Sequence, residues 1–269
     1  VLDHLAAEGM TFNRAYCQYP VCGPSRASFL SGLYPESTGV IDNKADIRQT
    51  RPGTASLPQV FKENGYWTAH VGKVFHTPNT DPGDMAWNAK GWFSNDELAV
   101  VVAAKKNFEA EHGSIEERRN RKAWKEARTK AAGLLTSQTP PGHGPSGLQD
   151  AQHKDGKNVR QVAKWVREQA HGDKPFFITC GIQKPHVPFL APDKYFAMYP
   201  QDGIRYLENP EDDLKDVPPT ALVKRAEAFG FEMGVENDSL RREYMQAYHA
   251  CVTFVDTQLK IMFDALKER

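Results

Sequence analysis

Residues 66–75 read YWTAHVGKVF, and residues 175–182 read PFFITCGI. Both runs are apolar and rich in aromatic and β-branched residues, which is typical of strands buried in a core. Each follows a stretch with helical features, residues 56–64 before the first and residues 158–170, with valines on one face, before the second. A helix followed by a short loop and a buried strand, twice over, predicts an α/β sandwich with a largely parallel sheet.

Further stretches extend this pattern on both sides. Residues 1–8 have the spacing of an amphipathic helix, and residues 10–15 fit a short strand. A helix is expected to start at residues 25–30 and to end at Gly32. Residues 241–269 form the clearest predicted helix, because their apolar side chains recur at steps of three and four.

The charge balance excludes some classes of protein. Lysine and arginine total 34, as do aspartate and glutamate, among 269 residues. Because phosphate binding needs clustered excess positive charge, a nucleic-acid binder is not expected. No run approaches the roughly 18 apolar residues of a spanning helix, so we expect no membrane segment.

Two polar segments lie in the middle of the chain. Residues 103–131 carry nine basic and five acidic residues, which predicts a solvated helical insertion. The composition of residues 136–147 predicts a loop.

The four cysteines do not predict a disulfide framework or a zinc site. Cys17 and Cys22 are five residues apart, and no second pair of cysteine or histidine at zinc-binding spacing accompanies them. Cys180 lies within a predicted strand and Cys251 within the last predicted helix. Both are expected to be thiols of the core.

Residues 22–32, CGPSRASFLSG, contain the most informative pattern. Cys22 directly precedes a helix expected to open with Pro24, where backbone N–H groups favour an anion. Arg26, one helical turn later, can reach back over the same place. A cysteine-dependent tyrosine phosphatase would need arginine six positions after its cysteine, where this chain has Ser28. Taken alone, the Cys-x-Pro pattern favours a structural cysteine at a helix start.

Lysine and histidine follow both predicted strands. Lys73 and His76 fall at the end of residues 66–75, and Lys184 and His186 come directly after residues 175–182. Ligands of parallel sheets bind beyond the carboxyl ends of the strands, so these side chains are candidates for a site. Alone, each segment also fits surface lysines and loop histidines.

The string at residues 22–32 resembles the signature of the type I sulfatases, C-x-P-S-R-x-x-x-L-[ST]-G, at every fixed position. Residues 72–76 are similar to the G-K-x-x-H element of that family, and residues 184–186 to its K-P-H element. The wider match is to the iduronate-2-sulfatase-like branch, and it fades across residues 80–150 and 205–240. This wider match is found at residues 19–22, 61–66, 184–189 and 248–258.

The resemblance implies a fold, a mechanism and a substrate class. The implied fold is an alkaline-phosphatase-like sandwich, with residues 1–269 as part of the N-terminal catalytic domain. A formylglycine-generating enzyme would oxidise Cys22 to formylglycine, whose hydrate attacks the sulfur of a sulfate monoester. The implied substrate is a 2-O-sulfated uronic acid or a related sugar of a sulfated polysaccharide such as a glycosaminoglycan. The implied location is extracytoplasmic: periplasmic, secreted or lysosomal.

The same resemblance assigns roles to the candidate residues. Arg26 would orient the matured Cys22, while Lys73, His76 and His186 would bind sulfate and supply protons. Lys184 is a weaker candidate for a contact with the substrate.

The resemblance also implies a divalent cation, usually Ca²⁺. Cys22, as formylglycine, would be one ligand, and the family's two aspartate-containing pairs would lie before Val1 and after Arg269. Asp42, Asp46 and the aspartates at 212–213 are expected to be loop carboxylates instead. Because Ca²⁺ needs about six to eight oxygen ligands, this chain alone is predicted to be inactive. Its ends, inside one predicted helix and directly after another, suggest truncation, and no signal peptide is recognisable.

Two other functions fit the fold implied by the resemblance. One is a sugar-binding protein that keeps the fold without turnover. The other is a phosphatase or phosphodiesterase of the same superfamily, which would use serine or threonine where this chain has Cys22. Trp87 and Trp92 could form a sugar-binding platform, although packing in the core is the simpler expectation.

Overall fold

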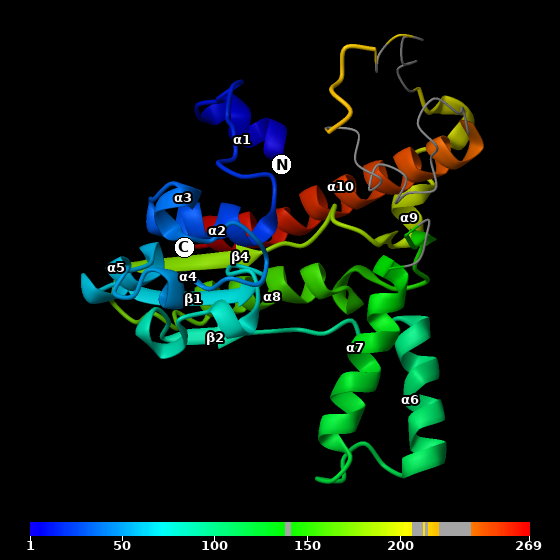
Figure 1. Ribbon diagram of the computed structural model, residues 1–269, viewed down its shortest axis with the longest axis horizontal. Coiled ribbons are helices and arrows are strands. Elements are labelled where there is room, and N and C mark those ends of the chain that lie inside the picture. The colour runs from blue at the N-terminus through cyan, green and yellow to red at the C-terminus, as the bar shows by residue number, and fades with distance from the viewer. Residues whose placement is uncertain (138–140, 206–211, 213–214, 221–237) are drawn as a thin grey trace. The chain divides into compact units, whose positions relative to one another are not determined.

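A computed structural model gives the conformation of most of the chain (Figure 1). The described residues are 1–137, 141–205, 212, 215–220 and 238–269. They form two compact units. The first unit comprises residues 1–93, 154–183 and 256–269, and the second comprises residues 94–153 and 184–255.

The first unit is built on a three-stranded parallel sheet (Figure 1). The strands are β1 (Trp67–Gly72), β2 (Ala89–Gly91) and β4 (Phe176–Gly181), in the order β2-β1-β4. β1 and β4 pair in register from Trp67 opposite Phe176 to Gly72 opposite Gly181. The two apolar runs therefore form neighbouring parallel strands, as the sequence predicts.

One face of this sheet packs on two helices. Val71 of β1, together with Ile178 and Cys180 of β4, lies in a cluster with residues of α8 (Lys154–Arg167) and the last turns of α10 (Asp238–Lys267). On α8 the buried side chains include Val159, Val162 and Val166, at the helical spacing expected from the sequence. Burial of this apolar stripe fixes α8 against the sheet.

The opposite face carries the segments that lead to the site. Phe177 of β4 stacks on Phe61 of α5 (Leu57–Glu63), with ring centroids 4.2 Å apart. Leu30 of α2 (Cys22–Ser31) packs in a cluster with Val74 and Trp87, which belong to the segments after β1. The sheet is thus covered on both faces, and the α/β sandwich is confirmed.

Two details differ from the sequence predictions. α2 begins at Cys22, so the cysteine is the first residue of the helix rather than the residue before it, and Gly32 ends the helix with φ 73°. Residues 10–15 form no strand, and Met10 and Phe12 are 79% and 73% exposed. Their backbone has no neighbouring strand with which to pair, so a favourable composition is not sufficient.

Short helices complete the first unit. They are α1 (Leu2–Glu8), α3 (Pro35–Thr38), α4 (Ile47–Thr50) and the 3₁₀ turns η1 (Pro78–Thr80) and η2 (Gly83–Met85).

The second unit contains the charged segment as a pair of helices. α6 (Ala99–His112) and α7 (Arg121–Ser137) contact each other through Phe108 and Trp124, whose ring centroids are 5.7 Å apart. The predicted helical character of residues 103–131 is confirmed. The prediction of a loop at residues 136–147 is partly wrong, because α7 continues to Ser137 and β3 (His143–Pro145) pairs with β5 (Phe189–Ala191).

The core of the second unit lies around the first part of α10. Cys251 and Phe254 of α10 are fully buried against Ala191 and against Tyr195 and Phe196 of α9 (Asp193–Phe196). Two further 3₁₀ turns, η3 (Asp150–Gln152) and η4 (Gln201–Gly203), belong to this unit. Within the described ranges, no helix is both long enough and apolar enough to cross a membrane.

The two cysteines predicted to be core thiols occupy different units. Cys251 is completely buried, and Cys180 is partly buried in β4. Burial raises the pKa of Cys180 to about 12, so this thiol stays protonated and unreactive at neutral pH. The prediction of core thiols is confirmed for both residues.

Candidate active site

Cys22 is fixed at the first position of α2 by its neighbours. The N–H of Gly23 donates to Oδ1 of Asn43 at 2.7 Å. A Cβ atom at residue 23 would lie only 2.9 Å from Asn43 Oδ1 and from the carbonyl oxygen of Asp42, so glycine allows the close approach of this loop. Cys22 itself is half-buried, and its position at the N-terminal, positive end of the helix dipole favours a negative charge beside it.

Arg26 joins α2 to the segment that follows β1. Its Nη1 donates to the carbonyl oxygens of Lys73 and Val74, at 2.9 and 2.6 Å. Burial lowers the pKa of Arg26, and the nearby Cys22 side chain acts in the opposite direction. A guanidinium stays protonated in proteins, so Arg26 places a permanent positive charge close to Cys22.

A crossing of two glycines positions Lys73. Gly72 has φ 74°, and a Cβ atom there would lie 2.3 Å from the carbonyl oxygen of Gly181. A Cβ atom on Gly181 would lie 2.3 Å from the nitrogen of Lys73. The Lys73 N–H donates to Gly181 at 3.3 Å. The backbone therefore turns sharply at the end of β1, and Lys73, the next residue, lies beside the end of β4.

His76 lies in the same neighbourhood as Arg26 and Lys73. Burial lowers its pKa, and the positive charges of Lys73 and Arg26 lower it further. Its Nδ1 is buried and has no hydrogen-bond partner among the described residues. His76 is therefore neutral near pH 7 and can accept a proton.

A buried His–Asp pair, which the sequence analysis does not identify, stabilises the segment after His76. Nε2 of His70, a fully buried residue of β1, lies 3.2 Å from Oδ2 of Asp81. The other carboxylate oxygen accepts the Gly83 N–H and the Trp87 Nε1–H, at 2.7 and 3.0 Å. The only hint in the sequence is a histidine within an apolar strand pattern. Burial lowers the pKa of His70 despite the nearby carboxylate.

The two tryptophans considered as a sugar platform differ in exposure. Trp87 is 2% exposed and packs in the core, which confirms for this residue the expectation of a packing role. Trp92, just after β2, is 37% exposed. Among these two side chains, Trp92 alone presents a surface that a ligand can contact.

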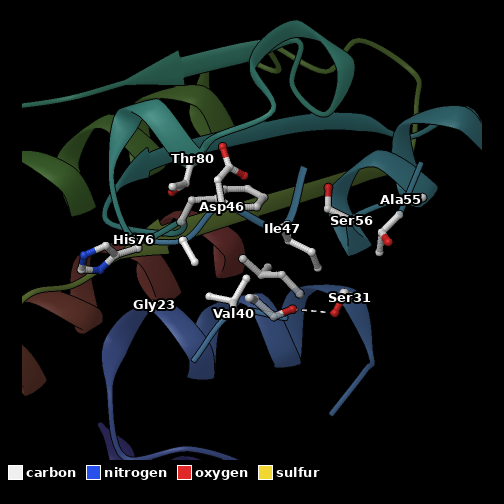
Figure 2. A pocket seen from close by; sticks show the side chains of 14 residues that line it. Gly23, Ser31, Val40, Asp46, Ile47, Ala55, Ser56, His76 and Thr80 are labelled. Atoms are coloured by element: carbon white, nitrogen blue, oxygen red, sulfur yellow. Dashed lines mark hydrogen bonds between the residues drawn. The ribbon is translucent and has the colours of Figure 1, made fainter. Parts of the chain in front are cut away.

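A small apolar pocket lies beside this group of residues (Figure 2). Figure 2 shows His76 at one end of it and Ala55 and Ser56 at the other. Neither lysine nor arginine lines it. The pocket therefore offers no cationic side chain to an anion. The lining residues are Gly23, Ala27, Leu30, Ser31, Val40, Ala45, Asp46, Ile47, Thr54, Ala55, Ser56, Phe75, His76 and Thr80.

Lys184 and His186 belong to the second unit. Nζ of Lys184 donates to the carbonyl oxygen of Pro188. His186 is exposed, and its Nδ1 lies 2.7 Å from the carbonyl oxygen of Val187. The structure thus brings Cys22, Arg26, Lys73 and His76 together in the first unit. It stays a prediction that Lys184 and His186 belong to the same site as these four residues.

The residues of this chain do not by themselves fit a Ca²⁺ site. In the described part of the chain, no group of three or more His, Cys, Asp or Glu side chains is arranged to hold a metal ion. Asp42 accepts the N–H groups of Lys44 and Ala45, and Asp46 pairs with Arg48 at 2.6 Å. Both are loop carboxylates with local roles, as expected. Asp212 is an exposed residue, and Asp213 lies outside the described residues.

Comparison with known proteins identifies the family. A family model of sulfatases matches residues 1–269. The chain belongs to the sulfatase family. A sulfatase from Formosa agariphila is 33% identical over 281 residues, which cover 98% of this chain and 50% of that protein. Iduronate 2-sulfatase from Homo sapiens is 28% identical over 280 residues, which cover 99% of this chain and 47% of that protein. The sulfatase chain thus spans about half the length of these curated relatives.

A solved structure confirms the fold of this sulfatase. The phosphonate monoester hydrolase of Agrobacterium radiobacter superposes with a TM-score of 0.65 at 18% sequence identity, covering 99% of this chain and 54% of that one. The fold is the alkaline-phosphatase-like α/β sandwich that the sequence resemblance implies.

Proposed function

We propose that the protein containing this chain hydrolyses sulfate monoesters of sugars, and that residues 1–269 are part of its catalytic domain. One observation carries the proposal: Arg26, from the helix that begins at Cys22, donates two hydrogen bonds to the backbone at Lys73 and Val74. The signature and the G-K-x-x-H element, which are some 50 residues apart in the sequence, thereby meet around one cysteine. Membership of the sulfatase family supports the same conclusion.

Cys22 is the proposed nucleophile after oxidation to formylglycine by a formylglycine-generating enzyme. The hydrated aldehyde offers one hydroxyl to attack sulfur and a second whose deprotonation expels sulfate and restores the aldehyde. A thiol lacks this second hydroxyl. The position of Cys22, half-buried at the first residue of a helix, supports this role because the positive end of the helix dipole favours the developing negative charge.

The other site residues have roles that follow from their charge. Arg26 and Lys73 bind the negatively charged sulfate oxygens. His76 is neutral, because burial and its cationic neighbours lower its pKa, and it accepts the proton of the attacking hydroxyl. We assign to His186 the protonation of the leaving oxygen, and to Lys184 a contact with the substrate. No step is assigned to Ca²⁺, for which the described residues provide no cluster of carboxylate ligands.

The substrate we propose is a 2-O-sulfated uronic acid or a related sugar of a sulfated polysaccharide. The similarity to human iduronate 2-sulfatase over 99% of this chain supports this class. Since such polysaccharides are found outside the cytoplasm, we propose an extracytoplasmic location for the protein.

The decisive experiment is a mass measurement on the protein co-expressed with a formylglycine-generating enzyme. Trypsin releases Cys22 in the peptide of residues 15–26, which also contains Cys17. Fragmentation of this peptide should show an aldehyde at Cys22 and an unchanged thiol at Cys17. Cys17→Ser should keep the modification and Cys22→Ser should abolish it. A thiol retained at Cys22 would exclude the proposed mechanism and favour a sugar-binding protein without turnover.

A further inference from the structure

Lys154, the first residue of α8, lies where all three strands of the parallel sheet end. Its Nζ is 5.8 Å from the ring centroid of Trp92, which follows β2, and 3.4 Å from Oε1 of Gln183, which follows β4. Lys73, which follows β1, is a close enough neighbour for its charge to act on Lys154. The carboxyl edge of a parallel sheet is the usual place for a ligand.

Lys154 is charged but not ion-paired in the part of the chain that the structure describes. Lys154 forms no ion pair with the residues that the structure describes. The adjacent carboxylate of Asp155 is buried and accepts the backbone N–H of Gln183 at 3.0 Å. Burial lowers the pKa of Lys154, Asp155 raises it, and Lys73 lowers it again. A partly buried ammonium without an anionic partner is unfavourable, and a bound anion would relieve this cost.

Lys73 links Lys154 to the residues around Cys22. The pKa of His76 responds to the charges of Lys73 and Arg26, and the pKa of Lys154 responds to the charge of Lys73. Lys73 is therefore a neighbour that both groups share. Lys154 thus adds a further positive charge to those assigned to the ester.

We propose that Lys154 binds a second anionic group of the sulfated sugar, a carboxylate or a further sulfate, while the sugar ring lies against Trp92. This inference rests on the proposed function, in which Lys73 and Arg26 hold the ester that is cleaved. An exposed tryptophan offers an apolar face to a sugar ring, and an ammonium provides a point charge that accepts either anion. Lys154 would thus determine specificity and take no part in the chemical step.

The test compares matched substrates with the full-length, matured protein. One pair is a 2-O-sulfated aryl glucuronide and its methyl ester, which lacks the carboxylate charge and keeps only that of the sulfate. The other is an aryl glucoside with sulfate at O2 alone and the same glucoside with a second sulfate at O6. The variants are Lys154→Met and, as a control, Lys164→Met, an exposed residue of the same helix that pairs with Glu168 at 3.9 Å.

We expect the wild type to prefer one or both doubly charged substrates, and the preferred pair identifies the anion. Lys154→Met should lower kcat/KM for that substrate by about 10- to 100-fold, the effect of losing a charge-assisted contact. The matched singly charged substrate should change by less than about 3-fold. Lys164→Met should behave as the wild type. Equal losses on both members of a pair, or no loss, would overturn the inference.

A binding measurement separates this inference from the proposed function. Calorimetric titration with sulfate-free glucuronate and with glucose 6-sulfate requires no turnover. If the wild type binds one of them and Lys154→Met does not, the second anion site stands even where no sulfate ester is hydrolysed. If the wild type cleaves none of the esters and binds neither sugar, the inference and the proposed function both fail.

Discussion

The crossing at Gly72 makes a quantitative prediction about the site. Alanine at this position must adopt φ 74°, a left-handed conformation that costs about 1–2 kcal/mol for a residue with a Cβ atom. The new methyl group would also lie 2.3 Å from the carbonyl oxygen of Gly181 and 2.4 Å from Nδ2 of Asn158. Those two atoms form a hydrogen bond of 3.0 Å, which the methyl group would break.

The steric cost of Gly72→Ala adds to the conformational cost. Overpacking costs about 1–3 kcal/mol, and the lost hydrogen bond about 1 kcal/mol. We therefore expect Gly72→Ala to lower the free energy of unfolding by about 3–6 kcal/mol. Gly65→Ala is the matched control, because Gly65 has φ 85° and nothing within 4 Å of its Cβ position. It should lose only about 1–2 kcal/mol.

Urea denaturation of the two variants and the wild type measures this difference. If Gly72→Ala is no less stable than Gly65→Ala, the prediction that the ends of β1 and β4 leave no room for a Cβ atom at residue 72 is wrong. The same variants test the site, since a shifted residue 72 displaces Lys73. In the full-length, matured protein, without urea and where both variants are folded, sulfatase activity should fall much further for Gly72→Ala than for Gly65→Ala.

Three other predictions test individual contacts. Arg26→Lys should reduce kcat/KM for a sulfate ester by about 10-fold or more, because a single ammonium cannot replace a guanidinium that binds two carbonyls and an anion. The pKa of His70 is lowered in the folded state, so the unfolded chain takes up a proton first as the pH falls below about 6.5. Stability should then fall by up to about 1.4 kcal/mol per pH unit, and denaturation of His70→Phe across this range should show a smaller slope. Iodoacetamide at pH 8 should label the exposed Cys17 and spare Cys180, whose pKa is raised to about 12, as peptide mass spectrometry can show.

The sequence predicts the central elements of the fold because their apolar patterns are long and regular. β1, β4, α8 and α10 all appear within a few residues of the expected ranges. β2 is three residues long and reads Ala-Lys-Gly, a composition without a strand signal. It becomes a strand only because β1 offers its edge. Residues 10–15 show the converse, a strand-like composition without a partner strand.

The candidate site divides in the same way. Cys22, Arg26, Lys73 and His76 stand in short patterns that the sequence displays directly. His70 and Asp81 are 11 residues apart in the chain, and Lys154 and Trp92 are 62 apart. Neither pair has a spacing that is typical of a known motif, so the contact is recognised only in the folded structure.

The way in which the site holds its cations agrees with a role in binding anions. Arg26 is held by two backbone carbonyl oxygens, and within the described ranges it forms no ion pair with a carboxylate. Lys154 rests on an aromatic ring and a side-chain amide. Carbonyl and amide oxygens orient a cation without cancelling its charge, whereas a carboxylate would compete with the ligand for it. The structural acid of this region, Asp81, is buried beside His70 and accepts N–H groups. Introducing a carboxylate at Gln183 should therefore weaken anion binding by pairing with Lys154, and a Gln183→Glu variant with lowered affinity for sulfated sugars but unchanged stability would bear this out.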